Sequence, residues 1–118
     1  MEPTASMALR AARKAGDLIV RASDDMDRVG YQAKAAADFV TEVDIAAEKE
    51  ILYQLGKAYP EHRFLCEESG LSGNEDSDYT WVIDPLDGTS NFLRGIPHYA
   101  ISIACLHRGK IEHAVVYD

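Results

Sequence analysis

Two helical patterns precede every strand-like pattern in this chain, and that order constrains its fold more than any other feature. Residues 6–23 are rich in alanine and repeat apolar side chains at helical spacing, which predicts an amphipathic helix. A second helical pattern begins at Thr41, where Thr41 and Asp44 resemble a capping box, and it ends at Tyr59 and Pro60. The sequence therefore predicts two consecutive helices ahead of a sheet.

Strand-like segments occupy much of the remaining chain. They span residues 63–66, 79–84, 99–106 and 111–117. A tight turn at Arg108 and Gly109 joins the last two, as in a β-hairpin. Two helices followed by a mostly antiparallel sheet predict an α+β fold, a layered sandwich of helices and sheet.

Two segments lack any period. Residues 24–38 are small and charged, which predicts a surface loop that carries Lys34, either exposed to solvent or poised above a site. A polar stretch with Gly70, Gly73 and Asn74 predicts a second loop, between the first two strands.

Composition limits the possible partners and location. The net charge of -8 argues against direct binding to nucleic acid or to an anionic membrane. Cys66 and Cys105 lie in apolar runs without metal-ligand spacing, which predicts buried thiols in a reducing compartment. No stretch approaches the roughly 20 apolar residues of a membrane span. We therefore expect a cytoplasmic chain of one domain, residues 1–118, that does not enter the membrane.

Acidic residues follow two of the predicted strands. "FLCEE" ends on Glu67 and Glu68, and "WVID" ends on Asp84, with Asp87 three residues later. Neighbouring strands of one sheet bring their ends close together. Clustered carboxylates repel one another, so such a site either holds protons or binds a cation. Oxygen ligands of this kind suit Mg²⁺, Mn²⁺ or Ca²⁺.

The residues after Asp84 suit a phosphate beside that cation. Pro85 fixes φ and lets the chain turn sharply, with the Leu86 carbonyl as a further possible ligand. Gly88 lets a ligand approach the backbone, and free N–H groups near Thr89 favour an anion if a helical turn begins there. Metal-assisted hydrolysis of a phosphate ester is then possible, with Thr89 orienting water and Asp44 accepting its proton.

Each of these features also has a structural alternative. Asp84 and Asp87 are common in solvated turns, where they accept nearby backbone N–H groups. Asp44 suits the first turn of a helix, and Thr89 suits a helix cap. Lys34 is most simply a solvated lysine.

Three motifs, "DFVTEVD", "FLCEES" and "WVIDPLDGTSNF", together resemble the first half of the inositol monophosphatase family, above all its bacterial inositol-1-monophosphatase members. The resemblance covers essentially the whole chain, and "DPLDGTSN" is its most specific part. It implies a layered αβαβα fold of which residues 1–118 form the N-terminal, metal- and phosphate-binding part.

The resemblance also implies roles for particular residues. Mg²⁺ would be held by Glu67, Asp84, the Leu86 carbonyl and Asp87. Catalysis would involve Glu67 at the metal, with Thr89 and Asp44 activating water. The substrate would contact Leu86, Asp87, Gly88, Thr89 and Lys34, the last of which matches a mobile-loop lysine of the family.

By this resemblance we expect a Mg²⁺-dependent, Li⁺-inhibited homodimeric phosphatase that hydrolyses inositol 1-phosphate. The family's later Trp-Asp motif, with another metal-binding aspartate and much of the inositol pocket, has no match here, so impaired activity is expected for these 118 residues. Phosphatases of fructose 1,6-bisphosphate or 3′-phosphoadenosine 5′-phosphate share the acidic motifs and are alternatives. A different alternative is a catalytically idle module that binds a protein of the transcription machinery.

Overall fold

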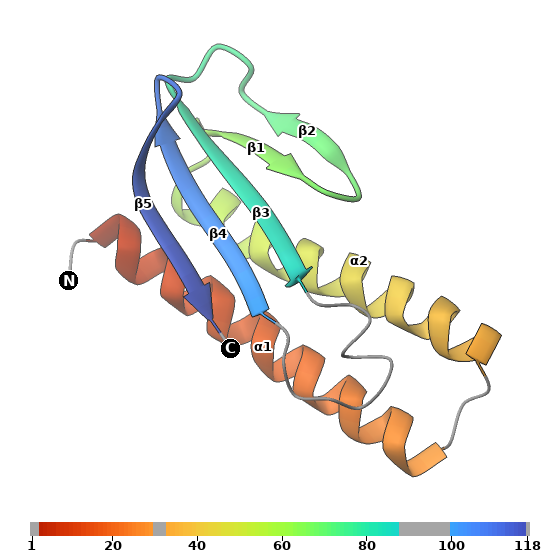
Figure 1. Ribbon diagram of the computed structural model, residues 1–118. Coiled ribbons are helices and arrows are strands. Elements are labelled where there is room, and N and C mark those ends of the chain that lie inside the picture. Colours follow the sequence, from red (N-terminus) through yellow and green to blue (C-terminus); the bar gives the residue numbers. More distant parts are fainter. Residues whose placement is uncertain (1–2, 30–32, 88–99, 118) are drawn as a thin grey trace.

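The computed structural model describes the backbone of residues 3–29, 33–87 and 100–117, and the side chains of 3–22, 24, 42–84 and 100–116. The elements are α1 (Pro3–Val29), α2 (Ala33–Ala58), β1 (Arg63–Cys66), β2 (Gly70–Gly73), β3 (Tyr79–Asp87), β4 (Ala100–His107) and β5 (Lys110–Tyr117), as Figure 1 shows.

The five strands form one sheet in the order β2-β1-β3-β4-β5. β1 runs parallel to β3, and the other three neighbouring pairs are antiparallel. The predicted α+β fold with a mostly antiparallel sheet is therefore confirmed. The parallel pair matters for function, because parallel neighbours end at the same edge of a sheet.

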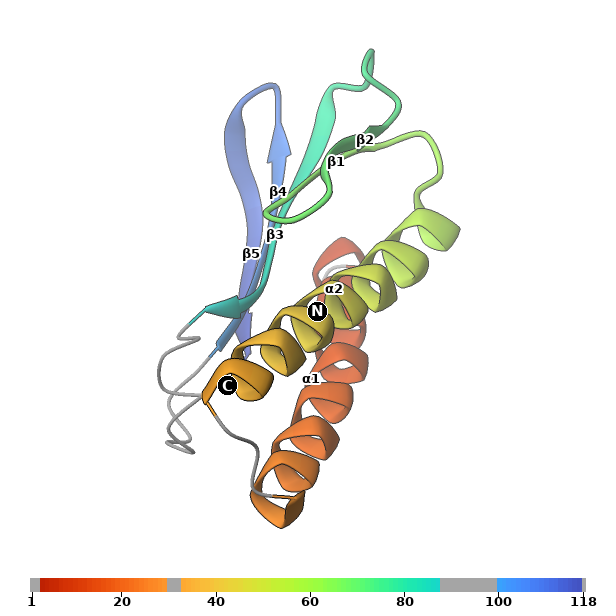
Figure 2. The same cartoon turned by 90° about the vertical axis from the view of Figure 1, so that its right-hand side faces the viewer.

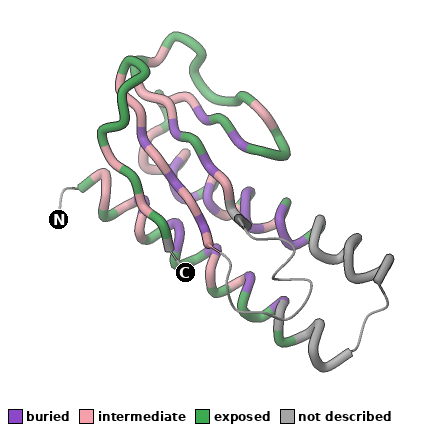
Figure 3. The backbone as a smooth tube through the Cα atoms, in the orientation of Figure 1, coloured by how far each residue is buried: buried purple, intermediate pink, exposed green. Residues whose placement is uncertain are grey.

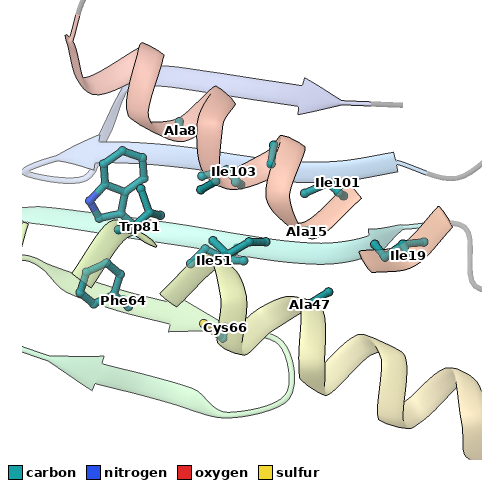
Figure 4. Close-up of a cluster of buried hydrophobic side chains, with 14 of the residues drawn as sticks. Ala8, Ala15, Ile19, Ala47, Ile51, Phe64, Cys66, Trp81, Ile101 and Ile103 are labelled. Carbon is teal, nitrogen blue, oxygen red and sulfur yellow. The ribbon is translucent and has the colours of Figure 1, made fainter. Parts of the chain in front are cut away.

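Both helices cover the same face of the sheet (Figures 1 and 2). α1 packs against β4 and β5, and α2 packs against β3. Alternate residues of β4 are buried towards the helices, as Figure 3 shows. The core between the layers includes Trp81, Ile103, Ile51 and Ile19 (Figure 4). Burial of these apolar side chains is the main force that holds helices and sheet together.

Small residues on α1 let the two helices and the sheet approach closely. Ala8, Ala11, Ala12 and Ala15 are almost completely buried. Alanine combines the highest helix propensity with the smallest side chain above glycine, so it serves both the helix and a tight interface. The alanine-rich pattern near the start of the chain is thus explained by packing.

The predicted surface loop at residues 24–38 is wrong. α1 continues to Val29 and α2 begins at Ala33, so the second helix also begins earlier than the predicted cap at Thr41. These ends of the two helices project beyond the sheet in Figure 1. The sequence of this region shows no apolar period, but residues such as alanine still favour helix.

A short strand replaces the predicted polar loop between the first two strands. β2 pairs antiparallel with β1, so that Leu71 lies opposite Leu65. Gly70 and Gly73 are the first and last residues of β2, with φ of 74° and 79°, a left-handed conformation that glycine adopts without strain. The sequence of β2 contains no β-branched residue, so its pairing depends on β1 and gives no local signal.

The remaining strand predictions are close to the structure. β1 is confirmed at both ends, and α2 ends just before Tyr59 and Pro60 as predicted. Arg108 and Gly109 form the predicted hairpin turn, with φ of 51° and 83°. Two consecutive positive φ values are typical of the tight turns that match the twist of a hairpin.

Two further predictions concern burial and membranes. Cys66 and Cys105 are both buried, as predicted, and neither forms a disulfide. In the described part of the chain, no helix is both long and apolar enough to cross a membrane.

Candidate functional site

The acidic ends of β1 and β3 are adjacent. Cys66 of β1 lies opposite Ile83 of β3 in a parallel pair, so Glu67 and Asp84 follow at the same edge of the sheet. A hydrogen bond between these two carboxyl groups raises the pKa of Glu67, and the negative charge of Asp84 raises it further. Glu67 is therefore harder to ionise than an isolated glutamate, and a cation bound beside it would favour the ionised form.

Asp44 reaches the same cluster from α2. Its side chain is only 8% exposed. Burial, together with the charges of Glu68, Glu67, Asp84 and Glu48, raises its pKa from 3.8 to about 7. Because α2 begins at Ala33, Asp44 lies far inside the helix. The alternative role of Asp44 at a helix start is therefore wrong.

Two oxygens in the cluster are buried and lack a partner. Asp44 Oδ1 and Asp84 Oδ1 are inaccessible to solvent and accept no hydrogen bond within the described residues. A buried polar atom without a partner costs about 1–3 kcal/mol. A cation or a shared proton would remove this cost, so the donor chemistry fits a hard divalent ion.

The described side chains do not by themselves form a metal site. Within residues whose side chains are described, no three His, Cys, Asp or Glu groups are close enough to hold one ion together. That statement does not include Asp87, whose side chain lies outside the described residues. Of the predicted ligand side chains, the described residues therefore place Glu67 and Asp84 together at one sheet edge, with Asp44 nearby.

For Leu86, Asp87 and Lys34, the structure describes the backbone but not the side chain. Leu86 and Asp87 are the last residues of β3, where Asp87 lies opposite Ala100 after an irregularity that follows Asp84. Proline at position 85 has no N–H for the sheet, which explains the irregularity. Lys34 lies in the first turn of α2 and not in a loop. The predictions for Gly88 and Thr89 concern residues outside the described part.

Glu48 is a member of the cluster that the sequence predictions missed. It is only 3% exposed. Its Oε2 accepts a hydrogen bond from the Glu68 N–H at 3.1 Å, and its Oε1 accepts one from the Ser69 N–H at 3.0 Å. A sequence signal existed, because Glu48 follows Asp44 by one helical turn and lies beside the buried Ala47.

The cluster is strongly anionic. Asp44, Glu48 and Asp84 are buried or half-buried, while Glu67 and Glu68 are exposed at the rim. Among the described residues, the ion pair with a lysine or arginine lies elsewhere, between Arg108 and Asp78. A group of carboxylates gathered at one sheet edge attracts cations.

These features define the class of protein. The inositol monophosphatase family matches residues 1–118, and the chain belongs to this family. The layered α+β fold and the acidic ends of β1 and β3 agree with that assignment.

Individual relatives are similar over the same region. The chain is 53% identical over 120 residues to the Nus factor SuhB of Pseudomonas aeruginosa, covering 100% of this chain and 44% of that protein. It is 50% identical over 118 residues to the Nus factor SuhB of Escherichia coli, with the same coverage. The chain therefore spans less than half the length of these relatives.

Solved structures show the same fold. The extragenic suppressor protein SuhB from Bartonella henselae matches with a TM-score of 0.84 and 40% identity over 98% of this chain and 44% of that chain. An inositol monophosphatase from Anabaena matches with a TM-score of 0.77 and 36% identity over 98% of this chain and 39% of that chain.

Proposed function

We propose that the protein containing this chain is a Mg²⁺-dependent phosphomonoesterase that hydrolyses inositol 1-phosphate. The observation that carries the proposal is the pair of buried, unpartnered oxygens on Asp44 and Asp84 beside the Glu67 carboxyl. Membership of the inositol monophosphatase family supports the same chemistry. The chain covers 44% of its relatives, so the activity is proposed for the protein in its natural length.

Four groups would hold Mg²⁺: the side chains of Glu67, Asp84 and Asp87 and the carbonyl of Leu86. When bound, Mg²⁺ supplies a nucleophilic water at neutral pH and offsets the charge of the phosphate. Asp84 is central to this set because it contacts Glu67 and also has a free buried oxygen. The pairing of β3 with β4 is irregular between Asp84 and Asp87, and such an irregularity changes the direction of the strand just before Asp87.

The chain's own residues would bind the substrate and move the proton. The N–H groups of Gly88 and Thr89 would hold the phosphate, and Lys34 would add a positive charge. Thr89 and Asp44 would orient the attacking water, with Asp44 as the proton acceptor. Asp44 suits this role because burial and the neighbouring carboxylates raise its pKa to about 7, which makes it a stronger base than an ordinary aspartate.

The proposal is tested by phosphate release from inositol 1-phosphate in Mg²⁺ and in EDTA. We expect activity only with Mg²⁺, and a fall in kcat of at least about 100-fold in Asp84→Asn. The control is Asp78→Asn, which removes an exposed carboxylate just before the other end of β3 and should leave kcat unchanged. Full activity in EDTA or in Asp84→Asn would contradict the proposal.

Substrate choice is tested in the same assay. Inositol 1-phosphate should give a higher kcat/KM than fructose 1,6-bisphosphate or 3′-phosphoadenosine 5′-phosphate. A reversed order would keep the metal-dependent phosphatase but replace its substrate.

A second candidate function is binding to a protein of the transcription machinery, because the similar proteins from P. aeruginosa and E. coli are named Nus factors. It predicts that the protein captures transcription proteins from its own cell extract, and that the Asp84→Ala, Asp87→Ala double variant captures them equally well. Loss of capture in the double variant would tie binding to the acidic site. No capture by either form would count against this function.

We also propose that the protein is a homodimer. Light scattering of the natural-length protein would test this.

A further inference from the structure

Glu48 connects α2 to the turn that follows β1. Its carboxylate is buried, and each oxygen accepts a hydrogen bond from a different backbone N–H, of Glu68 at 3.1 Å and of Ser69 at 3.0 Å. These two residues come directly after Glu67. The carboxylate therefore fixes the backbone at the point where β1 ends and the acidic cluster begins.

The Glu48 carboxylate adds a further acidic group to the cluster. A buried carboxylate is costly unless its oxygens are hydrogen-bonded, and here the bonds are to neutral N–H groups. Its charge also lies close enough to Asp44 and Glu67 to oppose their ionisation. A carboxylate offers one acceptor oxygen to each of the two N–H groups, which a neutral Gln cannot do. A cation bound in the cluster would offset the repulsion that this charge adds.

We propose that Glu48 is a positioning residue for the metal site: it holds the Glu68 and Ser69 N–H groups so that the Glu67 carboxyl faces Asp84. This inference rests on the proposed function, because it assigns a role in binding Mg²⁺. Groups behind the direct ligands that fix their orientation commonly change metal affinity by about 10- to 100-fold when they are replaced.

Two substitutions separate position from charge. Glu48→Asp keeps the charge but shortens the side chain by one methylene, so the carboxylate no longer reaches both N–H groups. Glu48→Gln keeps the length but presents an NH₂ group to one of them, which loses one bond and the charge. If Glu48 acts by position, both variants weaken Mg²⁺ binding. If Glu48 acts only through the electric field of its negative charge, Glu48→Asp binds Mg²⁺ as tightly as the unaltered protein.

Gln54→Ala is the matched control for a general loss of helix stability. Gln54 lies on the same helix, is 6% exposed, and donates a hydrogen bond from Nε2 to Glu50 Oε1 at 3.2 Å. It follows Glu48 in the chain by nearly two helical turns and makes no bond to the β1–β2 turn among the described contacts. Its replacement should lower the unfolding temperature without changing Mg²⁺ affinity.

The experiment is calorimetric titration of the natural-length protein with Mg²⁺ alone, below the unfolding temperature of every variant. We expect Glu48→Asp and Glu48→Gln each to raise the Mg²⁺ dissociation constant by about 10-fold or more, with Gln54→Ala unchanged. In a Glu67→Gln background, Glu48→Asp should add little, because its effect passes through Glu67.

The alternative outcomes are distinct. Mg²⁺ affinity that is unchanged in Glu48→Asp overturns the positioning role while the proposed function stands. An additive effect in the Glu67→Gln background also overturns it, since Glu48 would then act through another group. A protein that binds no Mg²⁺ before any substitution overturns the proposed function, and this inference falls with it.

Discussion

At the scale of single residues, Asp44 links the charge of the cluster to the stability of the fold. Its pKa rises from 3.8 to about 7 in the folded protein. Between these values the folded state retains a proton that the unfolded state releases. The contribution of Asp44 to the free energy of unfolding is therefore complete below the lower value and is lost as the pH rises through the higher one.

This predicts that the metal-free protein becomes less stable as the pH rises from about 5 to about 7.5, and that Asp44→Asn reduces this loss. His62, whose pKa is lowered by burial, contributes in the opposite direction below its ordinary value of 6.5, and it is present in both proteins. The pH dependence of stability in the unaltered protein, minus that in Asp44→Asn, therefore gives the contribution of Asp44. Urea unfolding in EDTA measures it, and equal slopes would refute the prediction. Mg²⁺ should remove the loss, because a bound cation favours the ionised carboxylate.

Part of the site could be predicted from the sequence because it depends on where strands end. Glu67 and Asp84 each follow an apolar run, and the pairing of β1 with β3 brings them together. Glu48 could not be predicted in the same way. Its partners are backbone N–H groups about 20 residues later in the chain, and only the packing of α2 against the sheet makes that contact.

At the scale of elements, β2 depends on one glycine more than on any side chain. A Cβ on Gly73 would lie 2.5 Å from the His62 carbonyl oxygen and 2.9 Å from Phe64 Cδ2. The carbonyl belongs to the backbone and accepts a hydrogen bond from Asn74, so it cannot move away easily. Only glycine therefore fits at position 73, the last residue of β2.

We predict that Gly73→Ala destabilises the protein more than Gly70→Ala. Both glycines have positive φ, which costs about 1–3 kcal/mol for another residue. Nothing lies within 4 Å of a Cβ on Gly70, so its variant pays the conformational cost alone. Gly73→Ala adds a clash with backbone. Urea unfolding of both variants measures the difference, and equal losses of stability would show that the β1–β2 pair adapts without cost.

The same element shows why the fold was only partly predictable. β1, β3 and the hairpin at Arg108 have local signals, namely apolar alternation and turn residues. β2 has none, since its four residues are Gly, Leu, Ser and Gly. The extended ends of α1 and α2 were missed because their small and charged residues show no apolar period, although they form helix.

At the scale of the whole molecule, both helices lie on one face of the sheet, and none of the described elements covers the other face. One apolar residue from each strand lies in register across that face. The row consists of Leu71, Leu65, Val82, Ala104 and Ala114. Its three largest members are 65%, 40% and 36% exposed, in that order. A contiguous apolar surface of this kind promotes association.

We predict that the 118-residue polypeptide self-associates through this face despite its net charge of -8. The Leu65→Thr, Val82→Thr double variant should associate less, because threonine removes apolar surface but suits a strand. Val20→Thr is the control, since Val20 is 52% exposed on α1, away from the sheet face. Sedimentation velocity over a range of concentrations measures the average mass. A monomer of 13.0 kDa at every concentration would contradict the prediction, and an equal effect of Val20→Thr would place the contact elsewhere.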